Sequence, residues 1–96
     1  MTVAKRASDK ELQRLYRAFA ASGDPAQVEA LMEDLCTIRE VHEMAQRLTV
    51  ALMLDAGESY TRIQERTGAS AATIARVSKC LNYGTGGYRT VIDSER

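Results

Sequence analysis

The chain has little of the chemistry that metal sites need. Its 96 residues include one histidine, His42, and two cysteines, Cys36 and Cys80, which stand far apart in the sequence. Zinc ligands usually occur as closely spaced pairs, so this sparse set excludes a recognisable zinc motif. We expect no bound metal, and we expect both cysteines to be reduced thiols that pack on apolar helix faces.

Patterns that predict catalysis are also lacking. No serine, cysteine or lysine has a neighbouring partner that would activate it as a nucleophile, and a single histidine on a helix flank is a weak candidate base. The glycines at positions 84, 86 and 87 follow a predicted helix and do not begin one, so they do not form a phosphate-binding loop. We therefore expect no enzymatic activity and no cofactor.

The sequence has neither a long hydrophobic run nor a net charge. Its longest dense apolar run, residues 48–54, is far too short to cross a bilayer, so we expect a cytoplasmic protein with no membrane partner. The 13 basic and 13 acidic side chains balance, whereas nucleic-acid-binding proteins are usually basic overall. The distribution is uneven, because residues 57–96 carry 6 basic and 4 acidic side chains and residues 1–56 carry 7 and 9. The small positive surplus therefore lies in the second half.

The periodicity of the apolar residues predicts helices and no strand. Ser8 with Glu11 forms a capping box that begins a helix over residues 9–21, and Asp24 before Pro25 begins another. Both helices carry apolar residues at three-and-four spacing on one face, which we expect to be buried: Leu12, Leu15, Tyr16, Phe19, Val28, Leu31, Met32 and Leu35. Residues 1–8 lack this pattern and are predicted to be a mobile arm, which leaves residues 9–96 as a single domain.

The longest predicted helix, residues 38–56, points to a dimer. A second capping box, Thr37 with Glu40, begins it. Beyond Gln46 the segment is apolar on nearly every side, and a helix of that kind must be buried on every side. So short a chain has little material to surround it. We therefore expect this helix to lie at the centre of a homodimer, the alternative being the central helix of a compact monomeric bundle.

Residues 59–81 predict two short helices joined by a tight corner. Ser59 begins the first helix, Gly68 can take the left-handed conformation that ends it, and Ser70 begins the second. The order is typical of a helix-turn-helix, whose second helix lies in the DNA major groove. The alternative is an ordinary helix pair that touches no nucleic acid. Apolar or small residues at every inward position favour the DNA-binding interpretation.

The second helix of this pair carries residue types that suit DNA. Ser70 and Thr73 can bond phosphates, while Arg76 and Lys79 add two positive charges. Small side chains near the start of the helix allow a close approach to base edges: Ala71, Ala72 and Ala75. A glycine-rich stop follows, and apolar residues near position 90 predict one or two closing turns that pack on the core.

From Thr37 to Leu81 the chain carries a family resemblance, in three segments. They are AQRLTVALML in the long helix, GESYTRIQERTGAS at the corner, and ATIARVSKCLNYG followed by Gly-Tyr. With them the chain resembles the tryptophan repressor superfamily, and most closely its YerC/YecD branch of TrpR-like proteins. The resemblance implies an all-α, intertwined homodimer that binds a palindromic operator on double-stranded DNA through a helix-turn-helix. Its two second helices would lie one DNA turn apart, ~34 Å.

The resemblance also implies which residues would meet DNA. Base-reading contacts would fall on Ala71, Ala72 and Ala75, whose methyl groups can offer only apolar contacts, for instance to a thymine methyl. Contacts to the DNA backbone would fall on five polar residues: Ser59, Thr61, Gln64, Ser70 and Thr73. We accordingly expect a transcriptional regulator that acts as a repressor.

The ligand site of the tryptophan repressor is only partly matched. The arginines that sandwich the indole there correspond to Arg47 and Arg76. Val77 replaces a glycine beside the ligand, and Cys80 replaces a serine near its amino group. A valine side chain would intrude on a flat indole, and a thiol is a weak hydrogen-bonding partner. We therefore expect no response to tryptophan, with both arginines facing solvent or DNA.

Two other functions are consistent with the sequence. The chain could be a helical protein-interaction module that uses the same helix pair as a docking surface, and its zero net charge supports this alternative. It could also be a repressor that senses a different, unidentified small-molecule effector in a pocket near Arg47 and Arg76.

Overall fold

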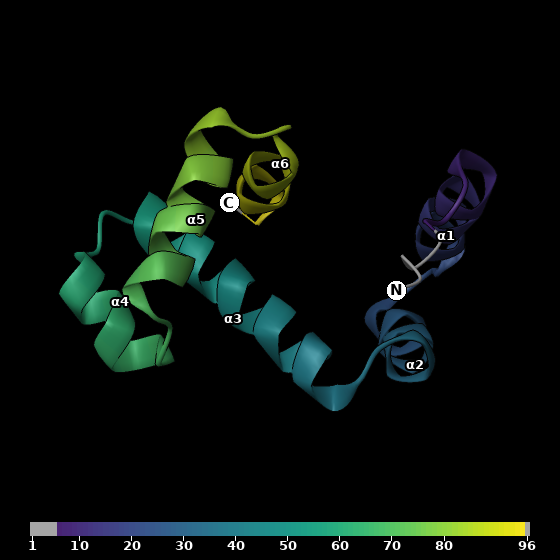
Figure 1. Cartoon of the computed structure of the whole chain (residues 1–96), viewed down its shortest axis with the longest axis horizontal. Helices are drawn as coiled ribbons and strands as arrows, with labels where there is room; N and C mark the ends of the chain where they lie inside the picture. Colours follow the sequence, from purple (N-terminus) through teal and green to yellow (C-terminus); the bar gives the residue numbers. More distant parts are fainter. Residues whose placement is uncertain (1–5, 96) are drawn as a thin grey trace, which may run out of the picture. The chain divides into compact units, whose positions relative to one another are not determined.

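The structure, a computed structural model, describes residues 6–95, and these residues form six α-helices with no strand (Figure 1). The all-α class predicted from the sequence is therefore confirmed. The helices are, in chain order, α1 (Asp9–Ala21), α2 (Pro25–Leu35), α3 (Ile38–Asp55), α4 (Tyr60–Thr67), α5 (Ala71–Tyr83) and α6 (Gly87–Ser94).

The chain divides into two compact units, residues 1–38 and residues 39–96. The N-terminal unit contains α1 and α2, and the C-terminal unit contains α4, α5, α6 and all of α3 after its first residue. Most of the arm predicted over residues 1–8 lies outside the described residues. The single domain predicted over residues 9–96 stays a prediction.

The helices of the N-terminal unit begin where the sequence predicts. The Ser8 hydroxyl accepts from the Glu11 backbone N–H at 3.2 Å, and the Glu11 carboxylate accepts from the Ser8 N–H at 3.0 Å. This capping box lowers the pKa of Glu11, first through the Ser8 backbone N–H and then through the Ser8 hydroxyl. Asp24 caps α2 by accepting from the Gln27 N–H at 2.9 Å, with Pro25 in the first turn.

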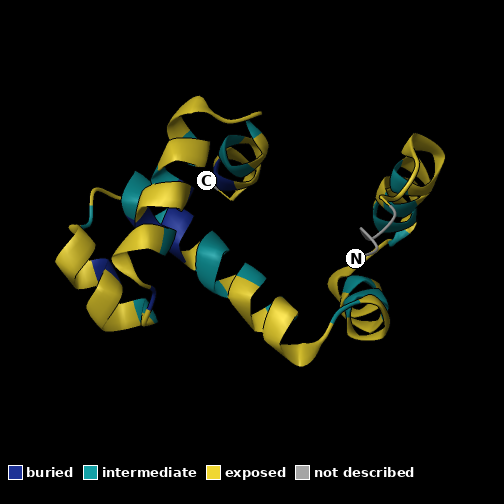
Figure 2. Cartoon of the chain, in the orientation of Figure 1, coloured by how far each residue is buried: buried dark blue, intermediate teal, exposed yellow. Residues whose placement is uncertain are grey.

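The apolar faces of these two helices are not buried within the chain. No residue of α1 or α2 is buried, and Figure 2 shows both helices without the dark blue of buried residues. The exposed fractions of Tyr16, Leu35 and Ile38, the first residue of α3, are 55%, 53% and 80%. The predicted burial of both stripes is therefore wrong for the single chain. The physical reason is size, because two short helices cannot enclose enough volume to shield their own apolar sides.

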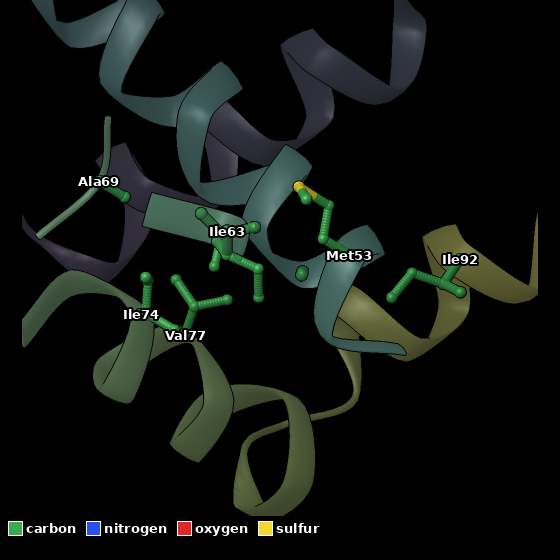
Figure 3. Packing of buried hydrophobic residues seen from close by; sticks show 8 residues of the cluster. Met53, Ile63, Ala69, Ile74, Val77 and Ile92 are labelled. Atoms are coloured by element: carbon green, nitrogen blue, oxygen red, sulfur yellow. The ribbon is translucent and has the colours of Figure 1, made fainter. Parts of the chain in front are cut away.

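The C-terminal unit has a core built from four helices and the corner between α4 and α5. Its buried side chains, most of which Figure 3 labels, are Val50, Ala51, Met53, Ile63, Ala69, Ile74, Val77 and Ile92. Four partly buried residues pack against them: Leu52, Leu54, Leu81 and Tyr88. The core thus fixes α4 and α5 against the second half of α3.

The apolar second half of α3 is covered largely by its own chain. Val50 and Ala51 are fully buried, and Leu52 and Leu54 are partly buried. Many of the apolar α3 side chains from which the sequence predicted a dimer are therefore buried by other helices of the C-terminal unit. The large exposed apolar side chains in the first 38 residues are Tyr16, Leu35 and Ile38.

Glycines end α3 and α5 and allow the chain to turn back on the core. Gly57 has a φ of +85°, and the N–H groups of Gly57 and Glu58 donate to the carbonyls of Leu54 and Met53, which is a Schellman motif. Helix α5 continues to Tyr83, slightly beyond the predicted end at Leu81. The predicted closing turns are confirmed as α6, which places Ile92 in the core.

Candidate nucleic-acid interface

The corner between α4 and α5 is built from residues 67–70. Gly68 has a φ of +74°, and its N–H donates to the Gln64 carbonyl at 2.9 Å. This is the left-handed conformation that the sequence predicted for Gly68, and it costs glycine little. Ala69 is buried, and Ser70 caps α5. The small side chain at position 69 lets the chain bend close to the core, so that α4 packs against α5.

Thr67 holds this corner through its side chain and its carbonyl. Its hydroxyl donates to the Ile63 carbonyl at 2.7 Å and accepts from the Ala69 N–H at 3.1 Å. Its carbonyl accepts from the Gln46 side-chain amide in α3 at 3.0 Å. The corner is therefore fixed both to α4 and to the long helix, which leaves the start of α5 with a defined position.

Helix α5 has one buried side and one exposed side. Ile74 and Val77 point into the core toward Ile63 of α4 (Figure 3). The opposite side presents exposed residues at three-and-four spacing: Ala72, Ala75, Arg76, Lys79 and Tyr83. Ala71 is exposed at the first position of the helix. All the predicted base-reading alanines are thus accessible, and both predicted cations lie on the same side of the helix.

The polar residues predicted to contact phosphates stand at the starts of the two helices. Ser59 caps α4 by accepting from the Arg62 N–H at 3.2 Å, and Thr61 and Gln64 are exposed on that helix. Ser70 caps α5 by accepting from the Thr73 N–H, and its hydroxyl donates to the Thr73 hydroxyl, both at 3.1 Å. The Ser70 proton is therefore used locally, and the Thr73 hydroxyl keeps its own proton to donate to an incoming acceptor.

The charges of this part of the chain are segregated. Residues 66–92 contain Arg66, Arg76, Lys79 and Arg89 and no acidic residue. Although the net charge of the whole chain is zero, this continuous segment, which includes all of α5, has only basic charged side chains. Such a segment attracts a polyanion more strongly than the balanced total suggests.

The four residues that correspond to the ligand site of the tryptophan repressor fall in different environments. Arg47 is half-buried on α3, Arg76 is exposed on α5, and Val77 is buried with only 1% of its surface exposed. Cys80 is exposed, so the prediction that it packs on an apolar face is wrong for the single chain. At about 100° per residue, position 80 lies on the flank of the stripe formed by Ile74 and Val77. Cys36 is half-buried.

Sequence reasoning missed Tyr83. The predicted second helix ends at Leu81, whereas Tyr83 is the last residue of α5 and 86% of it is exposed. Its spacing from Lys79 and Arg76 places it on the same side of the helix. A phenol hydroxyl there can contact a phosphate. The signal that could have revealed it is this spacing, continued past Leu81.

Two further properties bear on partners. Within residues 6–95, no helix has the length and apolarity needed to span a membrane. No three His, Cys, Asp or Glu side chains in that same range gather closely enough to hold a metal ion.

Comparison with known proteins places this arrangement in a family. The sequence profile of the Trp repressor protein family matches residues 10–96. The chain is 45% identical over 84 residues to the protein YerC of Bacillus subtilis, covering 88% of this chain and 81% of YerC. It is similar to the crystal structure of a TrpR-like protein from Eubacterium eligens, with a TM-score of 0.85, 40% identity and 88% of each chain covered. A candidate Trp repressor from Staphylococcus aureus has a TM-score of 0.86 at 33% identity, covering 92% of this chain and 88% of that one. The chain therefore belongs to the Trp repressor protein family, a family of DNA-binding regulators.

Proposed function

We propose that this protein is a homodimeric repressor of transcription that binds a palindromic operator through α4 and α5. In this proposal α4 and α5 form a helix-turn-helix, and α5 is the recognition helix that enters the major groove. The main support for this proposal is the exposed side of α5, which has small residues followed by Arg76 and Lys79 and has no acidic side chain. Family membership supports the same conclusion.

The recognition helix would read bases with its first turns. Ala71, Ala72 and Ala75 are exposed and short, so the backbone of α5 can lie close to the base edges. Their methyl groups suit the C5-methyl of thymine in the major groove. Farther along the helix, Arg76 and Lys79 would bind phosphates, and these contacts fix the register of the protein on the duplex.

Polar groups around the corner would complete the phosphate contacts. We assign this role to four residues that are accessible or that keep a free donor: Ser59, Thr61, Gln64 and Thr73. We also assign it to Ser70, whose hydroxyl would have to turn away from Thr73 to donate to a phosphate. The positive segment from residue 66 to residue 92 would draw DNA toward them.

The N-terminal unit would provide the dimer contact. Its two helices bury no residue within the chain, and Tyr16, Leu35 and Ile38 are more than half exposed. Apolar surface on this scale is rarely left in water by a small protein. A second copy of the same chain is the occupant we assign, because operator palindromes match the two-fold symmetry of a dimer.

We further propose that tryptophan is not the effector. Val77 belongs to the core, where it packs with Ile63 and Ile74. Cys80 is exposed and has only a weakly hydrogen-bonding thiol. A ligand that needs the volume of a glycine at position 77 would have to displace this core side chain.

Selection from a pool of random duplexes by the purified full chain tests this function. We expect enrichment of a two-fold symmetric sequence whose half-site centres lie one DNA turn apart, ~34 Å. Mobility shifts should then show that the enriched duplex binds more tightly than a scrambled duplex of the same composition. Absence of any sequence preference, even at low salt where phosphate attraction is strongest, would rule the proposal out.

The protein-interaction alternative makes the opposite prediction. It requires a protein partner that is retained by the chain after nuclease treatment, together with no enriched duplex. A variant with both Arg76→Ala and Lys79→Ala separates the two functions, because it should lose duplex binding. The matched control is Arg14→Ala, which removes an exposed cation from α1 and should leave duplex binding unchanged.

A further inference from the structure

An ion pair joins the two ends of the segment that contains α4 and α5. The Nη1 atom of Arg89, in α6, lies 2.8 Å from the Oδ1 atom of Asp55, the last residue of α3. The two residues are 34 positions apart, and the whole of α4 and α5 lies between them. The ion pair therefore holds the end of α3 next to α6, on either side of the segment that contains α4 and α5.

The surroundings of Asp55 favour retention of this pair. Its side chain is only 12% exposed, and a carboxylate so far removed from water needs a charged partner. It also stands at the C-terminus of α3, where the helix carbonyls disfavour a negative charge. The positive charge of the Arg89 guanidinium offsets both the loss of hydration and the repulsion from the helix carbonyls.

The other ion pairs of the described residues are looser. Arg89 also approaches Asp93 at 3.6 Å, but that carboxylate is 58% exposed. Arg62 and Glu58 lie 3.9 Å apart, with both side chains exposed to at least 36%. Exposed pairs of this kind contribute little, so the contact between Arg89 and Asp55 is the stronger of the two ion pairs that Arg89 makes.

The connection between α5 and α6 is short, so a restraint on the position of α6 also restrains the end of α5. Only residues 84–86 separate α5 from α6. The Gly84 N–H donates to the Cys80 carbonyl at 2.9 Å, and a Cβ at Gly84 would lie 2.3 Å from that carbonyl oxygen, so the chain turns tightly there. Because α6 is also anchored by Ile92 in the core, its placement determines where α5 ends.

From these contacts we infer that Arg89 is a positioning residue for the recognition helix. Its ion pair with Asp55 sets the direction of α5 relative to α3, and thereby the half-site spacing that a dimer accepts. The inference rests on the proposed function, because spacing matters only if two copies of α5 enter successive major grooves. Arg89 itself need not touch DNA.

The test compares three duplexes with the full chain. They are the duplex that the wild-type chain enriches from a random pool, the same duplex with one base pair added between its half-sites, and a scrambled duplex. For Asp55→Asn we expect the preference for the enriched duplex over the other two to fall about tenfold, as for one mismatched base pair. Affinity for the scrambled duplex should not fall.

The sign of this effect separates positioning from simple electrostatics. Asp55→Asn removes a negative charge, so charge alone would tighten binding to every duplex. Positioning instead weakens binding to the enriched duplex alone. Arg89→Met should lose the same preference, although the removal of a cation from the positive segment should also weaken its binding to all three duplexes by a common factor. Asp93→Asn, which removes the exposed partner of the same arginine, is the matched control and should keep the wild-type preference.

Several outcomes would overturn the inference. Unchanged or tighter binding of the enriched duplex by Asp55→Asn would do so, as would equal losses on all three duplexes in proportion to unfolded protein. A loss for Arg89→Met alone would make Arg89 a phosphate contact and not a positioning residue. If Asp55→Asn does not fold, Arg89→Met takes its place in this comparison, and an unchanged preference for the enriched duplex by folded Arg89→Met overturns the inference. A wild-type chain that enriches no duplex would instead refute the proposed function itself.

Discussion

The side-chain amide of Gln46, in the middle of α3, donates a hydrogen bond of 3.0 Å to the backbone carbonyl of Thr67 at the end of α4. This carbonyl is one of those that a helix end leaves without a partner inside the helix. The bond therefore ties the corner before the recognition helix to the long helix. It is a contact between residues 21 positions apart that no local pattern reveals.

Gln46→Ala should consequently destabilise the protein. The substitution removes the side-chain amide that donates to the part-buried Thr67 carbonyl, and the loss of this hydrogen bond should lower the free energy of unfolding by about 1–2 kcal/mol. Urea denaturation followed by circular dichroism measures the change. Gln13→Ala is the matched control, because Gln13 is exposed on α1, and its effect should stay within about 0.5 kcal/mol. Equal stabilities for the two variants would show that the bond contributes nothing.

Gly68→Ala and Gly87→Ala should change stability in opposite directions. Neither added Cβ would meet an atom within 4 Å, so packing is not the issue. Gly68 has a φ of +74°, where an L-residue costs about 1–2 kcal/mol, and the variant should be destabilised by that amount. Gly87 lies in α6 with an ordinary φ, where alanine should stabilise by about 0.5–1 kcal/mol. Denaturation midpoints for both variants check this, and a destabilised Gly87→Ala would contradict it.

Much of the secondary structure could be predicted because its signals are local. Ser8, Asp24 and Ser70 cap helices as their residue types suggest, and Gly68 takes the left-handed conformation. The helix pair that carries the candidate site follows from such signals together with the apolar positions at Ile74 and Val77. These features depend on neighbours within one or two turns, so the sequence contains them directly.

Features that depend on distant contacts could not be predicted in this way. Periodicity marks an apolar face but does not say what covers it, and for this reason the faces of α1 and α2 were expected to be buried. The exposure of Cys80 and of Tyr83 depends on how far the core extends along α5. The pairing of Arg89 with Asp55 joins two helices that carry no sequence signal for each other.

Salt dependence should identify the cations that bind phosphates. If Arg76 and Lys79 each contact one phosphate per protomer, alanine at either position should reduce the slope of log affinity against log salt by about 2 per dimer. The reduction should be equal on enriched and scrambled duplexes, because phosphate contacts carry no base information. Fluorescence anisotropy between low and moderate salt measures the slope. Arg14→Ala should keep the wild-type slope, and if both α5 variants also keep it, this side of the helix does not face DNA.

Thermal stability should depend on protein concentration. A dimer whose N-terminal helices are shielded only by the second copy melts at a higher temperature as its concentration rises. Leu15→Asp places a charge on the apolar face of α1 and should give a less stable monomer by sedimentation velocity, with loss of duplex binding. Lys10→Glu changes a charge on the polar face of the same helix and should remain dimeric. A wild-type melting temperature that does not vary with concentration would contradict the proposed dimer.

Tryptophan should change neither the stability nor the duplex affinity of the wild-type chain. Val77 is 1% exposed and packs in the core, so position 77 holds a side chain that the fold needs and cannot offer the room that a glycine would. Val77→Ala should therefore destabilise the protein by about 2 kcal/mol, the usual scale for removing buried methyl groups. Cys80→Ala, at the exposed position one turn farther along α5, should change stability by less than about 0.5 kcal/mol. Melting curves and mobility shifts with and without tryptophan measure both effects. If tryptophan raises the melting temperature of the wild-type chain, the indole finds room despite Val77, and the proposed independence from tryptophan is wrong.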